Sequence, residues 1–148
     1  MNVARDKTLN QLDGTAQASP SFRSHVATEV HRLRDVPLSH LTTEDLRLLI
    51  GQQIGLGYVV PVAVERIEQQ PLASGDFYRG DLLVALLRVP AAFWQQHRDS
   101  RCRLEQVARS QVAQFTGMSH QKQQKLAATW EPLQEAYETF TGVARTTA

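Results

Sequence analysis

The sequence predicts an all-α fold, a single-domain helical bundle of about seven helices with short connections. Apolar residues recur at spacings of three and four over most of the chain, as on the buried face of an amphipathic helix. Serines, threonines, prolines and glycines stand where these segments should begin or end. We expect a helical domain over residues 19–141, between a loosely ordered N-terminal segment, residues 1–18, and a frayed tail, residues 142–148.

The first helix is expected to begin at Ser19-Pro20, because a hydroxyl cap followed by proline is a typical helix start. Its apolar face consists of Phe22, Val26, Val30 and Leu33. Upstream of it, Leu9 and Leu12 are the side chains that could dock on the body of the domain.

The second helix is capped by Thr42 or Thr43, and Glu44 and Asp45 in its first turn meet the positive end of its dipole. Its apolar face consists of Leu46, Leu49 and Ile50. Residues 51–57 contain three glycines. They either continue the helix or form a turn, and the sequence leaves both readings open.

Residues 58–64 are rich in β-branched residues and could form a strand, but Pro61 is hard to place in a central strand. We therefore expect a helix with Pro61 in its first turn and its end near Gln70. Its inner side consists of Val60, Ala63, Val64 and Ile67. A loop over residues 72–80 follows, and the next short helix has Leu82, Leu83, Leu86 and Leu87 inward.

The C-terminal third is expected to hold three helices. Pro90 starts a short one, residues 97–100 are turn-like, and a helix over residues 104–115 stops at Gly117. Ser119 caps the last helix, which carries the cleanest apolar stripe of the chain: Leu126, Trp130, Leu133, Tyr137 and Phe140.

The composition excludes several classes of protein. There are 16 Lys and Arg against 15 Asp and Glu, so the charge gives no support for direct nucleic-acid binding. No apolar run approaches the roughly 20 residues of a membrane span, and residues 1–7 do not resemble a secretory signal. Cys102 is the only cysteine, so a reducing cytoplasm is the simplest location. His25 and His31 lie on different helix faces, and no metal or other cofactor is expected.

The charges are unevenly spread along the chain. Residues 38–87 carry six acids and three bases, whereas residues 88–128 carry seven bases and two acids. Opposed patches of this kind can steer a protein partner toward its site. They can equally be ordinary solvated helix faces.

Two groups of residues could carry chemistry. Cys102 could act as a nucleophile with His97 or His120, but no motif positions it, and an incidental thiol is the simpler interpretation. Asp76 and Asp81 could form an acid–base pair. The simpler interpretation is that Asp76 holds a turn and Asp81 caps the following helix.

The loop over residues 72–80 contains two adjacent aromatic residues. Aromatic side chains beside carboxylates are typical anchors of protein interfaces. We expect Phe77 to be buried in the core and Tyr78 to be at least partly accessible.

The most specific segment is Gly75-Asp76-Phe77-Tyr78-Arg79-Gly80-Asp81-Leu82-Leu83. Together with residues 41–56, with Val60-Pro61-Val62-Ala63 and with the opening Thr8-Leu9-Asn10-Gln11-Leu12-Asp13-Gly14, it resembles the immunity proteins of bacterial contact-dependent growth inhibition (CDI) systems. Asp13 stands where this family usually has Glu, and Arg79 stands where a proline is expected.

The resemblance implies a cytoplasmic antitoxin that is not an enzyme. Such a protein binds the C-terminal toxin domain of its cognate effector, expected here as a one-to-one heterodimer. The toxin is expected to be a nuclease, neutralised by stoichiometric occlusion.

A nuclease has a basic cleft for phosphates, so acidic groups on its inhibitor are the natural counterpart. On that ground the predicted toxin contacts are Glu65, Glu68, Asp76, Tyr78 and Asp81. The alternative contact face is basic and consists of Arg98, Arg101, Arg109 and Lys122.

Two other functions remain open at this stage. A small helical nucleic-acid-binding regulator would use a basic cluster formed by Arg98, Arg101, Arg103 and Arg109. A small enzyme would use Cys102 or the two aspartates.

Overall fold

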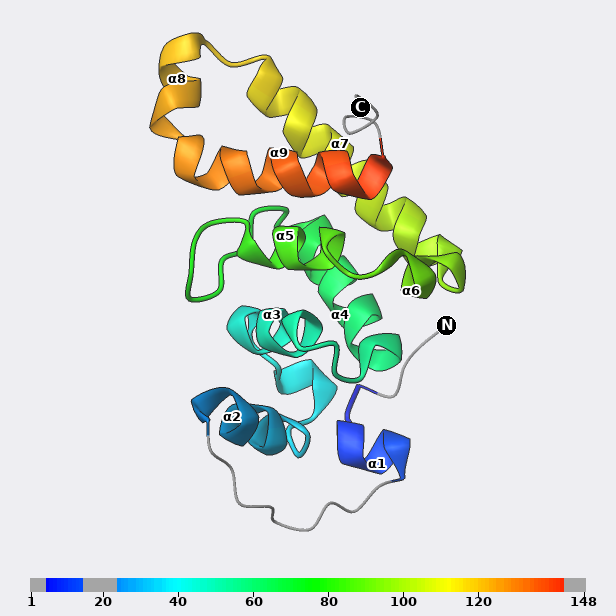
Figure 1. Ribbon diagram of the computed structural model, residues 1–148. Helices are drawn as coiled ribbons and strands as arrows, with labels where there is room; N and C mark the ends of the chain where they lie inside the picture. Colours follow the sequence, from blue (N-terminus) through cyan, green and yellow to red (C-terminus); the bar gives the residue numbers. More distant parts are fainter. Residues whose placement is uncertain (1–4, 15–23, 143–148) are drawn as a thin grey trace.

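The computed structural model describes residues 5–14 and 24–142 (Figure 1). Within these ranges the chain forms nine α-helices and one short 3-10 helix, and no strand. The predicted all-α class is therefore confirmed. The elements are α1 Leu9–Asp13, α2 His25–Leu33, the 3-10 helix Leu38–His40, α3 Thr43–Gly51, α4 Leu56–Gln69, α5 Asp81–Leu87, α6 Ala91–Gln95, α7 Arg98–Thr116, α8 His120–Lys125 and α9 Ala127–Thr141.

The helices form three levels along the long axis of the molecule (Figure 1). Helices α1 and α2 lie at one end, α3, α4 and α5 form the middle, and α7, α8 and α9 form the other end. Helix α5 packs against α3 and α4 on one side and against α9 on the other, and α7 packs against α4. The short helix α6 connects α5 to α7.

The expected docking of Leu9 is confirmed. Helix α1 has a capping box between Thr8 and Gln11, and Leu9 is completely buried. Leu9 packs against Gly55, whose φ of +60° and close approach to the leucine favour a residue without Cβ. The proposed boundary between residues 18 and 19 and most of the proposed tail 142–148 lie outside the described residues.

Helix α2 begins at His25. The start predicted at Ser19-Pro20 lies outside the described residues. Ser24 has an extended conformation, and its hydroxyl accepts a hydrogen bond of 3.1 Å from the backbone N–H of Ala27. The helix therefore starts at the serine whose side chain satisfies a free N–H group.

Within the segment 51–57, residues 52–55 form a turn that joins two helices. Helix α3, capped by Thr42 as one of the two predicted caps, ends at Gly51. Gln53 then has a φ of 58°, and α4 begins at Leu56. Pro61 lies inside α4 instead of in its first turn. Its missing N–H leaves only the carbonyl of Gly57 without a helical partner, and Gly57 is exposed to water.

Two expectations for the C-terminal third are wrong. Residues 98–100 are helical, because α7 begins directly after His97. The last helix is split in two. Ser119 caps α8 as expected, but Leu126, with φ −103° and ψ 11°, separates α8 from α9.

The core lies in the middle level, and all the apolar residues predicted to face inward in α3, α4 and α5 are buried. The C-terminal stripe is covered less completely, since Leu133 is buried but Leu126 is 36% exposed. None of the helices that the structure describes is both long and apolar enough to cross a membrane.

Candidate functional site

The loop between α4 and α5 is organised by Asp81. This aspartate is only 2% exposed, and its carboxylate accepts hydrogen bonds from the backbone N–H groups of Gly75 (2.6 Å), Phe77 (3.1 Å) and Tyr78 (3.4 Å). Gly80, at a φ of 88°, occupies the cap position of α5, so Asp81 bonds to the loop instead of capping the helix. A buried carboxylate with three such partners fixes the path of the loop.

Helix α3 supplies a second support for this loop. Arg47 binds Glu44 through two hydrogen bonds of 2.7 and 2.5 Å, and its Nε lies 4.0 Å from Oδ2 of Asp81. The backbone N–H of Asp76 donates to Oε1 of Glu44 at 2.8 Å. These bonds, above all the two from Arg47, hold the pKa of Glu44 below its ordinary value.

Phe77 is 69% exposed, so the expectation that it is buried is wrong. The loop N–H groups point inward to Asp81, and the ring of Phe77 lies instead over the guanidinium of Arg47, 4.0 Å from Cζ to the ring centroid. Tyr78 is half-buried, as expected, and burial raises the pKa of its phenol. The loop thus displays one aromatic ring to solvent while its backbone stays tied down.

The predicted acidic contacts are in different situations. Glu65 pairs with Arg5 at 2.7 Å, and Glu68 forms an ion pair with Arg103 of α7. Asp81 is buried, as described above. The carboxylate of Asp76, in contrast, is exposed and forms no ion pair with any described residue. Only Asp76 and Tyr78 of the five therefore share an accessible surface with Phe77.

A hollow of about 320 Å³ adjoins this loop. It lies between α3, the loop and α5. The residues lining it include Arg47, Gln53, Phe77, Tyr78, Ala85 and Arg88. We call Asp76, Phe77, Tyr78 and this hollow the Phe77 surface. Its two main components, the exposed ring and the Arg47 support, were missed by the sequence analysis. The spacing of Glu44 and Arg47 indicates a helical ion pair, but nothing in it shows that the loop returns to them.

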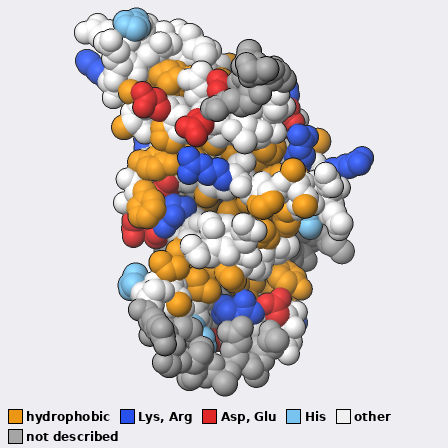
Figure 2. Space-filling view, viewed as in Figure 1, with side chains coloured by type: hydrophobic (Ala, Val, Ile, Leu, Met, Phe, Trp, Pro, Cys, Tyr) orange, Lys and Arg blue, Asp and Glu red, His pale blue; other side chains and the backbone are white. Residues whose placement is uncertain are grey.

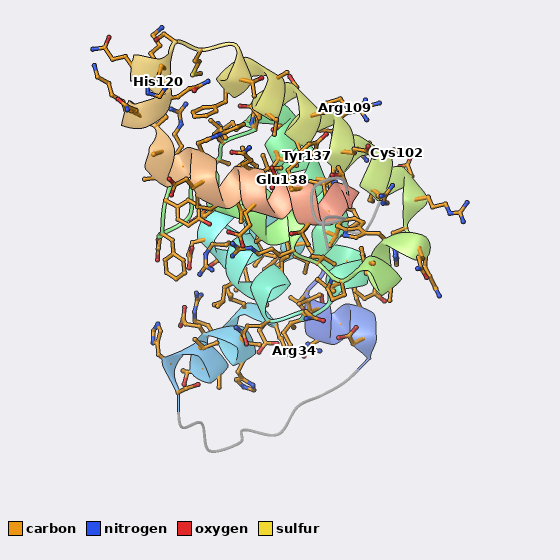
Figure 3. All side chains as sticks on the ribbon, turned by 45° about the horizontal axis from the view of Figure 1, so that its top comes forward. Arg34, Cys102, Arg109, His120, Tyr137 and Glu138 are labelled. Atoms are coloured by element: carbon orange, nitrogen blue, oxygen red, sulfur yellow. The ribbon has the colours of Figure 1, made fainter. Side chains whose placement is uncertain are left out.

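The alternative basic residues do not form one continuous patch. Arg98, Arg101 and Arg109 lie along α7, and Arg109 binds Glu105 at 2.9 Å. Figure 3 shows Arg109 beside Tyr137 of α9, while His120, on the same helix as Lys122, lies at the far end. The side chain of Tyr137, and after it the Glu105 carboxylate, raise the pKa of the Arg109 guanidinium.

The candidate catalytic groups are not assembled into a site. Cys102 is exposed, and Figure 3 shows it well apart from His120. The Nδ1 of His97 is 2.9 Å from the carbonyl oxygen of Phe93, and its ring stacks on Phe93. The Asp81 carboxylate already accepts hydrogen bonds from three backbone N–H groups of the loop. Among the described residues there is also no group of three side chains that could hold a metal ion.

Comparison with known proteins gives one match. A family model described as CDI immunity proteins matches residues 11–104, which are 94 of the 148 residues. Neither the curated proteins nor the solved structures gave a match. The matched segment includes α3, α4, α5 and the whole Phe77 surface, whereas α8 and α9 lie beyond it.

Proposed function

Since the chain belongs to the family of CDI immunity proteins, we propose that it neutralises the C-terminal toxin domain of its cognate effector by binding it in a one-to-one complex. The protein acts in the cytoplasm as a stoichiometric inhibitor and not as an enzyme. It occludes a surface that the toxin needs for activity, and it uses no cofactor. The toxin is a nuclease in this proposal.

The observation that carries the proposal is the exposed ring of Phe77, held in place by the rest of its loop. Aromatic side chains commonly provide much of the binding energy of protein interfaces. A partner gains most from such a side chain when its backbone is already ordered, because less conformational entropy is then lost on binding. The three N–H groups bound by Asp81 and the Arg47 support provide that order.

The charge beside Phe77 supports a nuclease as the toxin. Asp76 is exposed next to the ring, and its carboxylate forms no ion pair within the described chain. A nuclease binds phosphates through a basic cleft, so a free carboxylate beside an aromatic anchor is suited to the edge of such a cleft. Glu65 and Glu68 are less available, because each is already paired with an arginine.

The first test is co-purification of the chain with the toxin domain encoded beside it, followed by calorimetry and a nuclease assay. We expect a one-to-one complex and loss of nuclease activity at equal concentrations. Phe77→Ala should weaken binding by about 2 kcal/mol or more, roughly thirtyfold. Its free energy of unfolding should stay within about 0.5 kcal/mol of wild type.

Val26→Ala is the matched control. Val26 is another exposed apolar side chain, 38% exposed, on α2, at the end of the molecule formed by α1 and α2. Its truncation should leave toxin binding unchanged. Absence of any complex with the wild-type chain would refute the proposed function. A complex that tolerates Phe77→Ala would instead refute only the choice of this surface.

A further inference from the structure

A second concave surface lies at the C-terminal end of α5. It is a groove of about 840 Å³ between the end of α5, α6, α7 and α9. Its floor is apolar and belongs to the core, since Leu87, Val89, Trp94 and Ala136 line it and each is at most 6% exposed. Most of the accessible surface of the whole groove lining is apolar, so the groove suits an apolar side chain of a partner without any rearrangement of the fold.

Aromatic contacts hold the groove open in one shape. The Nε1 of Trp94 donates to the carbonyl of Val89 at 3.2 Å, and the ring of Phe140 meets Trp94 edge to face at 6.1 Å. The guanidinium of Arg101 lies over the outer face of Phe140, 5.0 Å from its centroid. Side chains from α6, α7 and α9 are therefore fixed against one another around the groove.

The rim of the groove is basic. Of the described residues that line it, Arg88, Arg98 and Arg101 are basic and Glu135 alone is acidic. Among the described residues, neither Arg88 nor Arg98 has a carboxylate within ion-pair distance, and Arg101 is 3.6 Å from Glu105. The other two arginines of α7 already form ion pairs, Arg103 with Glu68 and Arg109 with Glu105. Within the described part of the chain, two positive charges where the groove opens are thus left without an acidic partner.

The groove is continuous with the Phe77 surface. Arg88 and Val89 line both the groove and the hollow beside Phe77. The charge of Arg88 also acts on the phenol of Tyr78, opposing the effect of burial. Figure 2 shows hydrophobic and basic side chains together across the middle of this face, at the level of α5 and α6.

Building on the proposed function, we propose that this groove is the second half of the toxin-binding surface. Its occupant is a segment of the toxin domain that inserts an apolar side chain between carboxylates. The apolar floor buries the side chain, and Arg88 and Arg98 pair with the carboxylates. The toxin surface seated here is acidic, so it differs from the phosphate-binding cleft that faces Asp76. Opposite charges then face each other both at the Phe77 surface and in the groove. This arrangement fixes the orientation of the complex as well as its affinity.

The only cysteine of the chain provides a direct probe of occupancy. Cys102 is exposed and lines the groove. A fluorescent maleimide should label the free protein readily and should label the toxin complex at least about tenfold more slowly, because a seated segment excludes the reagent.

Charge reversal tests the chemistry of the occupant. We expect Arg98→Glu to weaken toxin binding about tenfold or more and Arg98→Lys to change it little. The affinity of Arg98→Glu for the toxin should also depend less on salt concentration than that of wild type. Arg98 is exposed at the first position of α7, where an acid favours the helix, so the variant should fold at least as well as wild type. Lys125→Glu on α8 is the control and should bind normally.

The outcomes separate the two proposals. If the wild-type complex forms but Cys102 is labelled at the free rate, or Arg98→Glu binds as well as wild type or better, the groove is not the site of an acidic segment. The proposed function then stands on the Phe77 surface alone. If the wild-type chain does not bind the toxin at all, the proposed function fails, and this inference fails with it.

Discussion

Helices α5 and α8 are similar in length, seven and six residues, but they are held in opposite ways. Six of the seven residues of α5 are buried, between α3, α4 and α9. No residue of α8 is buried. Helix α8 depends on local bonds, namely its Ser119 cap and the side chain of Gln123, which donates to the carbonyls of Phe115 and Met118. Isolated helices this short are unstable in water, so packing maintains α5 and local hydrogen bonds maintain α8.

The difference also separates what family membership explains from what it does not. Helix α5 lies inside the segment that matches the family model, residues 11–104, and α8 lies outside it. The matched segment contains the buried middle level, and its apolar residues mainly hold the fold. Choice of a partner has to depend on exposed side chains, and Phe77 and Arg98 are exposed. The family therefore identifies the scaffold, while these side chains are the ones to test for specificity.

The largest expected effect is a loss of folding stability when a buried side chain of α5 is truncated. Leu86 of α5 is fully buried, so Leu86→Ala should lower the free energy of unfolding by about 2–5 kcal/mol, through lost burial and the cavity left behind. Leu126, between α8 and α9, is 36% exposed, and Leu126→Ala should cost less than about 1 kcal/mol. Urea denaturation of both variants measures the difference.

Leu86→Met is the control for shape at the same position. It keeps most of the buried volume and should cost less than about 1.5 kcal/mol. If truncation at Leu126 were as costly as truncation at Leu86, the C-terminal helices would belong to the same packing unit as α5, and the contrast drawn above would be wrong.

The next effect concerns the carboxylate at the start of α5. Asp81→Ala removes the acceptor of three loop N–H groups and should destabilise the fold by about 1–3 kcal/mol. Amide hydrogen exchange should become faster at Gly75, Phe77 and Tyr78 and stay unchanged in α8. Asp81→Asn keeps one acceptor oxygen without the charge, so it should fall between wild type and Asp81→Ala. Unchanged exchange in the loop of Asp81→Ala would show that other contacts order it.

The interior of the middle level could be predicted from sequence. Apolar residues at helical spacing correctly identified the inward faces of α3, α4 and α5, because burial there is nearly complete. The same pattern in α9 identified a face that is only partly covered. Periodicity gives the direction of a side chain but not the amount of structure packed on it.

The candidate surface was harder to predict, because long-range contacts decide it. The exposure of Phe77 depends on Asp81, four residues later, and on Arg47, thirty positions earlier in α3. Likewise, Glu68 and Arg103 appeared free in the sequence but form an ion pair between α4 and α7. Local spacing does not reveal such long-range pairs. The predicted acidic contacts therefore included residues, such as Glu68, that already form ion pairs within the fold.

The smallest effect is the pH dependence contributed by Glu44. Its pKa in the folded protein lies below the ordinary value of 4.5, chiefly because of the hydrogen bonds from Arg47. The stability that it adds is therefore fully present above about pH 4.5 and is lost as the pH falls through the lower folded pKa. Glu44→Gln should cost less than about 1 kcal/mol near neutral pH, and the difference from wild type should shrink toward about pH 3.

Urea denaturation of wild type and Glu44→Gln at both pH values measures this contribution, and hydrogen exchange at Asp76 assigns it. The Asp76 N–H donates to Glu44, so its exchange should become faster in Glu44→Gln. Glu29→Gln on α2 removes a similarly spaced partner of Arg32 at the surface, and it should leave exchange at Asp76 unchanged. If Glu44→Gln and Glu29→Gln had the same effect on hydrogen exchange at Asp76, Glu44 and Arg47 would form an ordinary surface ion pair. The Phe77 loop would then be ordered by Asp81 alone.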